Sequence, residues 1–190
     1  MKKSKFLKIA VAIVAVAALV CATFGVNIFV EKQWIYPVKY SDLVSKYSQM
    51  YSVEEAWIYA VINCESGFES DAVSSAGAIG LMQITPETFT WLQNWDDTEE
   101  NLSADMLYDA EINIKYGTLL LSLNFQEFGN MQTTIASYNA GRGKVSEWLA
   151  DERYSNDSRT LTRIPYGETE KYVENVVKNY HYYSRRLKEK

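Results

Sequence analysis

A long uncharged stretch near the N-terminus sets the first limit on how this chain can fold. Residues 9–30 are 22 consecutive positions without a charged side chain. As a helix they would be about 33 Å long, which is enough to cross the hydrocarbon layer of a bilayer. Four lysines precede the stretch, and basic residues hold such an end in the cytoplasm. The pattern predicts one transmembrane anchor within residues 1–30, with residues 31–190 on the outer side of a cell membrane.

A cleaved secretory signal is the alternative interpretation, because basic residues followed by an apolar run also begin signal peptides. The stretch is long for a cleaved signal, and no clear small-x-small site closes it. The residues before Cys21 also lack the small side chain that a lipoprotein site needs. We therefore expect a retained anchor, a stalk over residues 31–40 and a folded domain over residues 41–190. That domain would be secreted if the anchor were removed.

The charge and the rare residues of the body exclude several classes of protein. From residue 31 onward the chain has 15 basic and 24 acidic residues, a net charge of −9. A nucleic-acid-binding protein needs a basic face, so no nucleic acid is expected as a partner. The body has one cysteine, Cys64, and one histidine, His181, so we expect no disulfide, metal or cofactor in it. Cys64 is expected in the core, and His181 in a packing or surface position.

Helical spacing of apolar residues dominates the body, and no strand-period pattern of any length occurs. The spacing predicts a mainly α domain with at most a small hairpin. The expected helices are residues 41–50, 53–65, a segment that begins at Pro86, 109–125, 131–138, 145–149 and a final segment after Gly167. The expected loops are residues 70–84, 94–103 and 151–164.

Several residues are expected to begin or end these helices. Ser52 and Glu55 form a capping box, and Gly67 should end the helix that follows Ser52. Asp109 should cap the long central helix, and Gly141 with Gly143 should end the helix over residues 131–138. The final helix has one expected buried face: Val173, Val176, Val177, Tyr180, Ser184 and Leu187.

Glu65 is singled out because its expected surroundings disfavour a charged carboxylate. Positions three, four and seven before it are Ile62, Val61 and Ile58, which share its helix face. Burial raises a carboxyl pKa, and so does the negative end of a helix dipole. A carboxyl group that stays protonated near neutral pH can protonate a glycosidic oxygen. The alternative is a helix-end glutamate that simply turns to water.

The segment after Glu65 has the composition of a loop that forms the floor of a cleft. Gly77 and Gly80 permit close backbone approach, and Gln83 offers an amide donor and acceptor suited to an N-acetyl group. We therefore expect residues 72–86 to form the floor of a cleft beside Glu65.

Four short motifs follow one another along residues 41–185. They are Glu65-Ser66-Gly67-Phe68, Gly80-Leu81-Met82-Gln83 with Pro86 after it, Ala136-Ser137-Tyr138-Asn139-Ala140-Gly141, and Ile164-Pro165-Tyr166-Gly167-Glu168-Thr169 leading to Tyr172-Val173. In this order they resemble the soluble lytic transglycosylase (SLT) family, which has a lysozyme-like fold. Each motif alone is weak, whereas four in order with helices between them are specific.

The resemblance implies a role for each matching residue. Glu65 corresponds to the catalytic acid/base, while Ser74 and Gln83 line the cleft and contact the sugar or its acetamido group. Met82 is expected to pack beneath the cleft. Cys64 stands where the family often has a polar residue.

The later motifs supply the remaining candidates. Tyr138 would direct its hydroxyl toward the catalytic carboxyl or the substrate, and Asn139 would support the same loop. Glu168 would lie across the cleft as a secondary acidic group, and Tyr172 is a further candidate. Arg142 departs from the pattern, because the family often has proline there.

The implied activity is cleavage of peptidoglycan glycan strands at the MurNAc-β-1,4-GlcNAc bond, with formation of 1,6-anhydro-MurNAc ends. Glu65 would be the sole general acid/base. Two alternatives stay open: a hydrolysing muramidase that resembles goose-type lysozyme, with Glu168 as water base, and a catalytically silent glycan-binding scaffold of the envelope. Protein partners in the envelope cannot be named from the sequence.

Overall fold

The computed structural model describes residues 16, 19–23, 26, 30–95 and 101–189. The chain divides into two units, Met1–Val38 and Lys39–Lys190. In the described part of the first unit, the π-helical turn η1 spans Glu31–Ile35 and exposes Trp34. Most of the predicted anchor, residues 9–30, lies outside the described residues. Within the described ranges, no helix is long and apolar enough to cross a bilayer.

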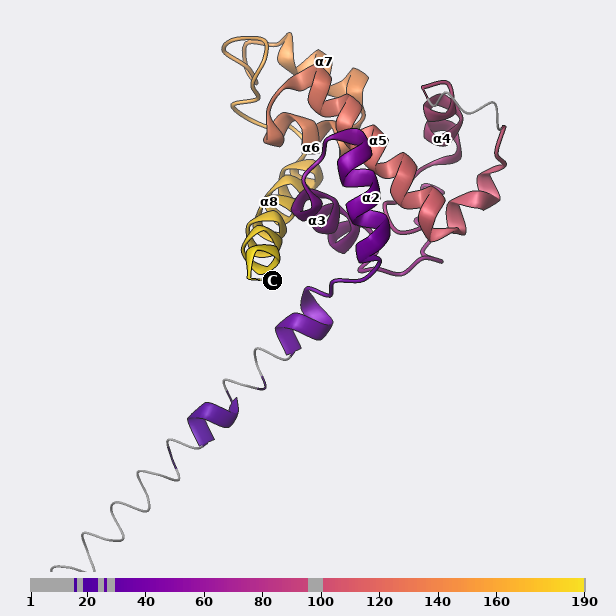
Figure 1. The fold of residues 1–190 in the computed structure, drawn as a ribbon. Coiled ribbons are helices and arrows are strands. Elements are labelled where there is room, and N and C mark those ends of the chain that lie inside the picture. The colour runs from indigo at the N-terminus through magenta and orange to yellow at the C-terminus, as the bar shows by residue number, and fades with distance from the viewer. Residues whose placement is uncertain (1–15, 17–18, 24–25, 27–29, 96–100, 190) are drawn as a thin grey trace, which may run out of the picture. The chain divides into compact units, whose positions relative to one another are not determined.

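The second unit is built from helices, which confirms the predicted mainly α class (Figure 1). They are α2 (Ser41–Tyr51), α3 (Glu55–Glu65), α4 (Pro86–Gln93), the 3₁₀ helix η2 (Ala104–Tyr108), α5 (Ala110–Phe128), α6 (Met131–Ala140), α7 (Arg142–Leu149) and α8 (Gly167–Lys188). The described residues contain no strand. Isolated antiparallel bridges join Val73 to Ile79, Ile79 to Ile84 and Ser155 to Leu161.

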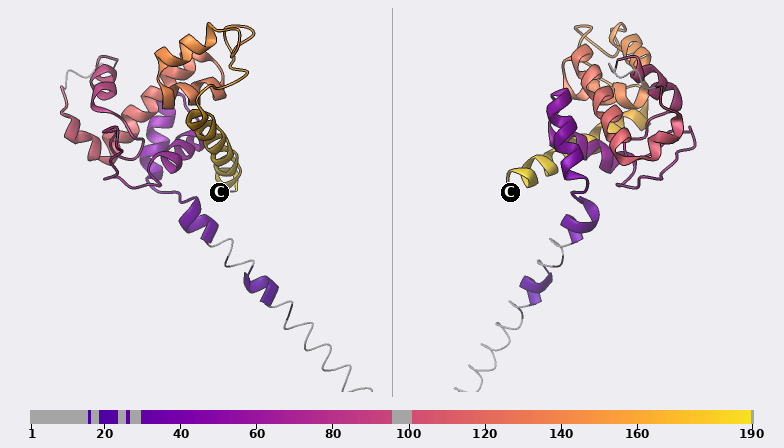
Figure 2. Two further views of the ribbon diagram at one scale, coloured as in Figure 1. Left: turned by 180° about the vertical axis from the view of Figure 1, so that it is seen from behind. Right: turned by 45° about the vertical axis from the view of Figure 1, so that its right-hand side comes forward.

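α5 forms the centre of this unit, because most of its residues are buried on all sides. It packs against α2, α4 and α6. Phe89 of α4 meets Tyr116 of α5 edge to face, with 4.7 Å between the ring centroids. α4 and α8 lie at opposite sides of the helical unit in each view (Figures 1 and 2).

α3 lies along α8, and the two form the most extensive helix pair of the described chain. Every residue of α3 from Ala56 to Ile62 is buried. Asn63 joins the two helices, since its side chain donates to the hydroxyl of Tyr183 at 3.2 Å and accepts from Asn179 at 3.0 Å. This pairing fixes the end of α3, where Glu65 stands, against α8.

The predicted capping box at Ser52 is wrong. Ser52 ends α2 instead, with a left-handed φ of 55°. An N-cap residue needs an extended backbone, which this conformation excludes. α3 therefore begins at Glu55, after Glu54.

An aspartate begins α5 and a glycine ends it, and its last residue differs from the one predicted. Asp109 caps α5 as predicted, since its carboxylate accepts from the N–H groups of Glu111 and Ile112. α5 continues to Phe128, three residues beyond the predicted end, where Gly129 has a φ of 69°.

The break between α6 and α7 needs only one of the two predicted glycines. Gly141, with a φ of 87°, separates the helices. Gly143 lies inside α7, which begins at Arg142 rather than Val145. η2 was not predicted, and residues 96–100 of the expected acidic loop lie outside the described residues.

The final helix is present as α8. Val173 and Val176 of its predicted face are buried, whereas the other four predicted residues are half-buried. Asn179 and Tyr183 are also buried on this face. Their polar groups tolerate burial because both bond to Asn63. The sequence did not predict this burial, because the partner lies on another helix.

Candidate active site

Glu65 is the last residue of α3, and the apolar face predicted around it is present. Three residues of that face are fully buried: Ile58, Val61 and Ile62. The next residue, Ser66, ties the helix end to the following loop. Its hydroxyl donates to the carbonyl of Leu81 at 2.8 Å and accepts from the N–H of Phe68 at 3.1 Å. Gly67 then leaves the helix with a φ of 58°, as predicted.

The loop after α3 is fixed by Asn113 of α5, whose role the sequence did not reveal. The buried amide of Asn113 donates to the carbonyls of Ile79 and Leu107 at 2.8 and 2.7 Å, and it accepts from the N–H of Met82 at 2.7 Å. A Cβ at Gly80 would lie 2.2 Å from Asn113 Nδ2. Glycine at position 80 is therefore required by this close approach.

A cleft of about 510 Å³ opens beside Glu65. Six of the seven predicted site residues line it: Glu65, Ser74, Gln83, Tyr138, Asn139 and Glu168. Thr88 of α4 and Leu120 of α5 also line it and were not predicted. Nothing in the sequence placed Leu120 in the cleft, because an apolar residue on a central helix is expected in the core. Met82 is fully buried against Gly117, as expected for a residue beneath the cleft.

Tyr172, the seventh candidate, contacts the carboxyl group itself. Its hydroxyl donates to Glu65 Oε1 at 2.5 Å. Tyr172 belongs to α8, so this bond joins the last residue of α3 to the helix packed along it. The carboxyl group is therefore held in one orientation.

Burial sets the proton affinity of Glu65. Loss of hydration raises the pKa of its carboxyl group from 4.5 to about 7. The hydrogen bond from Tyr172 acts in the opposite direction and is the smaller effect. Near neutral pH the group therefore occurs in both protonation states, and it can donate a proton and later accept one.

Tyr138 stands beside Glu65, and its hydroxyl donates to the carbonyl of Met82 at 2.8 Å. Burial, followed by the negative charge of Glu65, raises the pKa of Tyr138 well above its ordinary value. The phenol thus stays neutral and holds the Met82 backbone. A contact of this hydroxyl with substrate stays a prediction.

Ser74 and Gln83 face the cleft from one loop. The hydroxyl of Ser74 accepts from the N–H of Ala78 at 3.0 Å. Gln83 has a φ of 50°, and its side-chain nitrogen donates to the carbonyls of Ala72 and Gly80 at 3.1 and 2.9 Å. Both N–H groups of this amide are thereby engaged, which leaves its Oε1 to accept a hydrogen bond from a ligand.

Asn139 of α6 and Glu168 of α8 also line the cleft. The Oδ1 atom of Asn139 accepts from the hydroxyl of Thr169, which is buried, at 2.8 Å. Glu168 precedes Thr169, lines the cleft and is exposed. The structure thus places a second carboxylate on the cleft that holds Glu65.

Residues 42–161 match the family described as Transglycosylase SLT domain. The chain belongs to this family. The soluble lytic murein transglycosylase of Escherichia coli K12 is 35% identical over 150 residues, which are 78% of this chain and 23% of the relative. The membrane-bound lytic murein transglycosylase C of Pectobacterium atrosepticum is 32% identical over 163 residues, covering 73% of this chain and 44% of the relative. The chain spans less than half the length of either.

Solved structures of the SLT family have the same fold, which confirms the predicted lysozyme-like domain. A complex of the 70-kDa soluble lytic transglycosylase with bulgecin A has a TM-score of 0.72 and 32% identity, over 80% of this chain and 25% of that one. An inactive glutamate-to-glutamine mutant of the lytic transglycosylase Slt from Pseudomonas aeruginosa has a TM-score of 0.71 and 31% identity, with the same coverage.

The single cysteine and the single histidine of this SLT domain are not among the residues that line the cleft. Cys64 is half-buried, its sulfur accepts from Asn179 Nδ2 at 3.1 Å, and burial raises the pKa of the thiol to about 12. His181 is exposed on α8. Across the described ranges, no group of three or more His, Cys, Asp or Glu residues is placed to hold a metal ion.

Proposed function

We propose that this SLT domain is a peptidoglycan lytic transglycosylase and that Glu65 is its single general acid/base. The observation that carries the proposal is the carboxyl group of Glu65, which lines the cleft and whose pKa is raised to about 7 by loss of hydration. The relatives named above are lytic murein transglycosylases. One solved neighbour is an inactive glutamate-to-glutamine mutant, which supports a glutamate as the group that reacts.

The proposed reaction uses the two protonation states of Glu65 in turn. Protonated Glu65 gives its proton to the oxygen between MurNAc C1 and GlcNAc C4, and the C1–O bond breaks. The 2-acetamido oxygen of the muramyl residue stabilises the positive charge at C1. Glu65, now anionic, takes the proton of the C6 hydroxyl, whose oxygen bonds to C1. The products are a 1,6-anhydro-MurNAc end and a free GlcNAc C4 hydroxyl, and no water is consumed.

Two neighbours of Glu65 support this sequence of steps. Tyr172 holds the carboxyl group in place and stabilises the anion formed after proton transfer. Gln83 Oε1 is free to accept from the acetamido N–H of the substrate, which would turn the acetamido oxygen toward C1. Ser74, Tyr138 and Asn139 are proposed as further contacts to the sugar.

A hydrolysing muramidase is the second candidate, and the position of Glu168 on the cleft favours it. An anionic carboxylate there could remove a proton from a water that attacks C1. The bond cleaved would be the same, and only the new end would differ.

Digestion of purified sacculi by the full chain tests both candidates. Mass spectrometry of the released muropeptides should find anhydro ends, each lighter by one water than a reducing end. Reducing ends would establish hydrolysis instead. A chain that binds sacculi and releases no soluble fragment would be a silent scaffold.

We also propose that residues 1–30 anchor the protein in a cell membrane, with the SLT domain on the outer side. The uncharged run behind four lysines supports this, and so does the existence of membrane-bound relatives. Alkaline extraction of membranes should leave the full chain in the pellet. Recovery of a shortened chain in the medium would show that the segment is cleaved.

A further inference from the structure

One stretch of the cleft is flanked by two walls that touch each other. Thr88 of α4 and Gly141, before α7, line the cleft from different elements. Trp91 stands one helical turn beyond Thr88, and Arg142 follows Gly141 directly. The guanidinium carbon of Arg142 lies 5.1 Å from the centroid of the Trp91 ring. The two walls are therefore joined just past the residues that line the cleft.

Arg142 also contacts α5. Leu120 of α5 lines the cleft, and Glu127 lies seven residues, or two turns, further along the same side of α5. Arg142 forms an ion pair with Glu127. The Arg142 side chain therefore bridges α4 and α5, each of which contributes a residue to the cleft lining.

The contacts of Arg142 hold a side chain that is 33% exposed in one position. Its Nη1 atom is buried and has no hydrogen-bond partner among the described residues. In water all five N–H groups of a guanidinium would be hydrated, so the position of Nη1 costs the group part of its hydration. The ion pair with Glu127 and the cation–π contact with Trp91 hold it there. Trp91 is in turn packed edge to face against Trp95, at 6.0 Å between centroids.

We propose that Arg142 closes one end of the substrate cleft and thereby limits how far a glycan strand extends past Glu65 on that side. This inference rests on the proposed function, because it concerns the strand that Glu65 cuts. A strand that stops at Arg142 is cut at a fixed distance from its terminus. A cleft open at both ends would accept the strand at any internal bond.

Digestion of long, peptide-free glycan strands by the full chain tests the role of Arg142. The products are sized by chromatography at matched extents of cleavage, so that differences in rate do not matter. The wild-type chain should release short products of one uniform length from the first time point. R142A should open the cleft, so that fragments of many lengths form early and the mean strand length falls several-fold faster per bond cut.

The control is K144A, which breaks an exposed ion pair with Glu147 on the same helix and does not touch the cleft. It should keep the wild-type product pattern. W91L removes the other partner of the contact and should reproduce the pattern of R142A, which covers the case in which R142A fails to fold.

Two results would overturn the role of Arg142: products of many lengths from the wild-type chain, or uniform products from folded R142A and W91L. A wild-type chain that releases nothing would refute the proposed function instead, and the role of Arg142 with it.

Discussion

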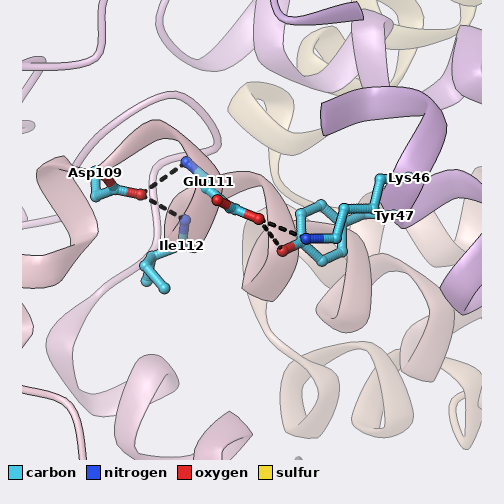
Figure 3. A network of polar contacts seen from close by, with 5 residues as sticks. All are labelled: Lys46, Tyr47, Asp109, Glu111 and Ile112. Carbon is cyan, nitrogen blue, oxygen red and sulfur yellow. Dashed lines mark hydrogen bonds and ion pairs between the residues drawn. The ribbon is translucent and has the colours of Figure 1, made fainter. Parts of the chain in front are cut away.

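Glu65 and Glu111, two of the glutamates that accept a hydrogen bond from a tyrosine hydroxyl, have pKa values shifted in opposite directions. Tyr172 donates to Glu65 at 2.5 Å, and Tyr47 donates to Glu111 at 2.9 Å. Burial raises the pKa of Glu65 to about 7. The Lys46 ammonium, 2.6 Å from the Glu111 carboxylate, is the main reason that the pKa of Glu111 falls below 4.5, and the Tyr47 hydroxyl adds to it (Figure 3).

The difference lies in solvent, in the charged neighbour and in the helix end. Glu111 and Lys46 have side chains that are 45% and 50% exposed, and Glu111 stands in the first turn of α5 behind its cap, Asp109 (Figure 3). That helix end favours negative charge, whereas Glu65 ends α3 at the terminus that disfavours it. A tyrosine donor therefore does not make a carboxyl group an acid near neutral pH. Burial of the carboxyl group does.

Loss of the Glu65 carboxyl group should have the largest effect on activity. E65Q keeps the size of the side chain and its hydrogen bond with Tyr172, but it can neither donate nor accept the transferred proton. We expect release of soluble muropeptides to fall by a factor of about a hundred to ten thousand. Circular dichroism should show an intact fold. E111Q is the matched control and should keep wild-type activity; similar losses in both variants would refute the distinction between the two glutamates.

The same substitution should stabilise the protein above neutral pH. The folded-state pKa of Glu65 is above its unfolded value, so its favourable contribution is present below about pH 4.5 and is lost as pH rises toward 7. The unfolding free energy of E65Q should therefore exceed that of the wild type by up to about 3 kcal/mol above pH 7, and this gain should shrink on acidification. Urea denaturation at several pH values measures it. E111Q should show no such gain at high pH, since the pKa of Glu111 is lowered.

Loss of the tyrosine donor should change the pH profile more than the fold. Y172F removes a bond that stabilises the Glu65 anion, so the pKa of Glu65 should rise and the alkaline limb of kcat/KM should move to higher pH. The maximal rate should fall roughly tenfold, the equivalent of one ordinary hydrogen bond. A merely structural Tyr172 would lower the rate and leave the alkaline limb in place. Y47F, which removes the equivalent bond to Glu111, is the control and should leave both unchanged.

Local patterns predicted the mainly α class and the apolar surroundings of Glu65, because those depend on neighbours in sequence, whereas the lysozyme-like fold came from the family resemblance. The spacing of Ile58, Val61 and Ile62 gave the buried face of α3 and the environment of Glu65. Ser52 was misassigned because the motif alone does not show that α2 ends there in a left-handed residue. The motif carries no information about the preceding helix.

Contacts between distant segments account for what the sequence did not reveal. Tyr172 was only a weak candidate, since it meets Glu65 across 107 positions of the chain. Asn113 fixes Met82 across 31 positions, and the sole local signal was a polar residue in an apolar helix. The contacts of Arg142 with Trp91 and Glu127 likewise required α4, α5 and α7 to be placed in space.

The smallest effect is expected at the exposed pair, and it isolates the contribution of the cation. K46M removes the ammonium and keeps most of the aliphatic stem, while the Tyr47 hydroxyl can still donate to Glu111. Exposed ion pairs add little to stability, so the melting temperature and the rate of wall digestion should stay at the wild-type level. NMR titration of the Glu111 carboxyl should show its pKa rising toward its ordinary value and stopping far below that of Glu65. A value near that of Glu65 would mean that burial is not what separates the two sites, because Glu111 would still be exposed.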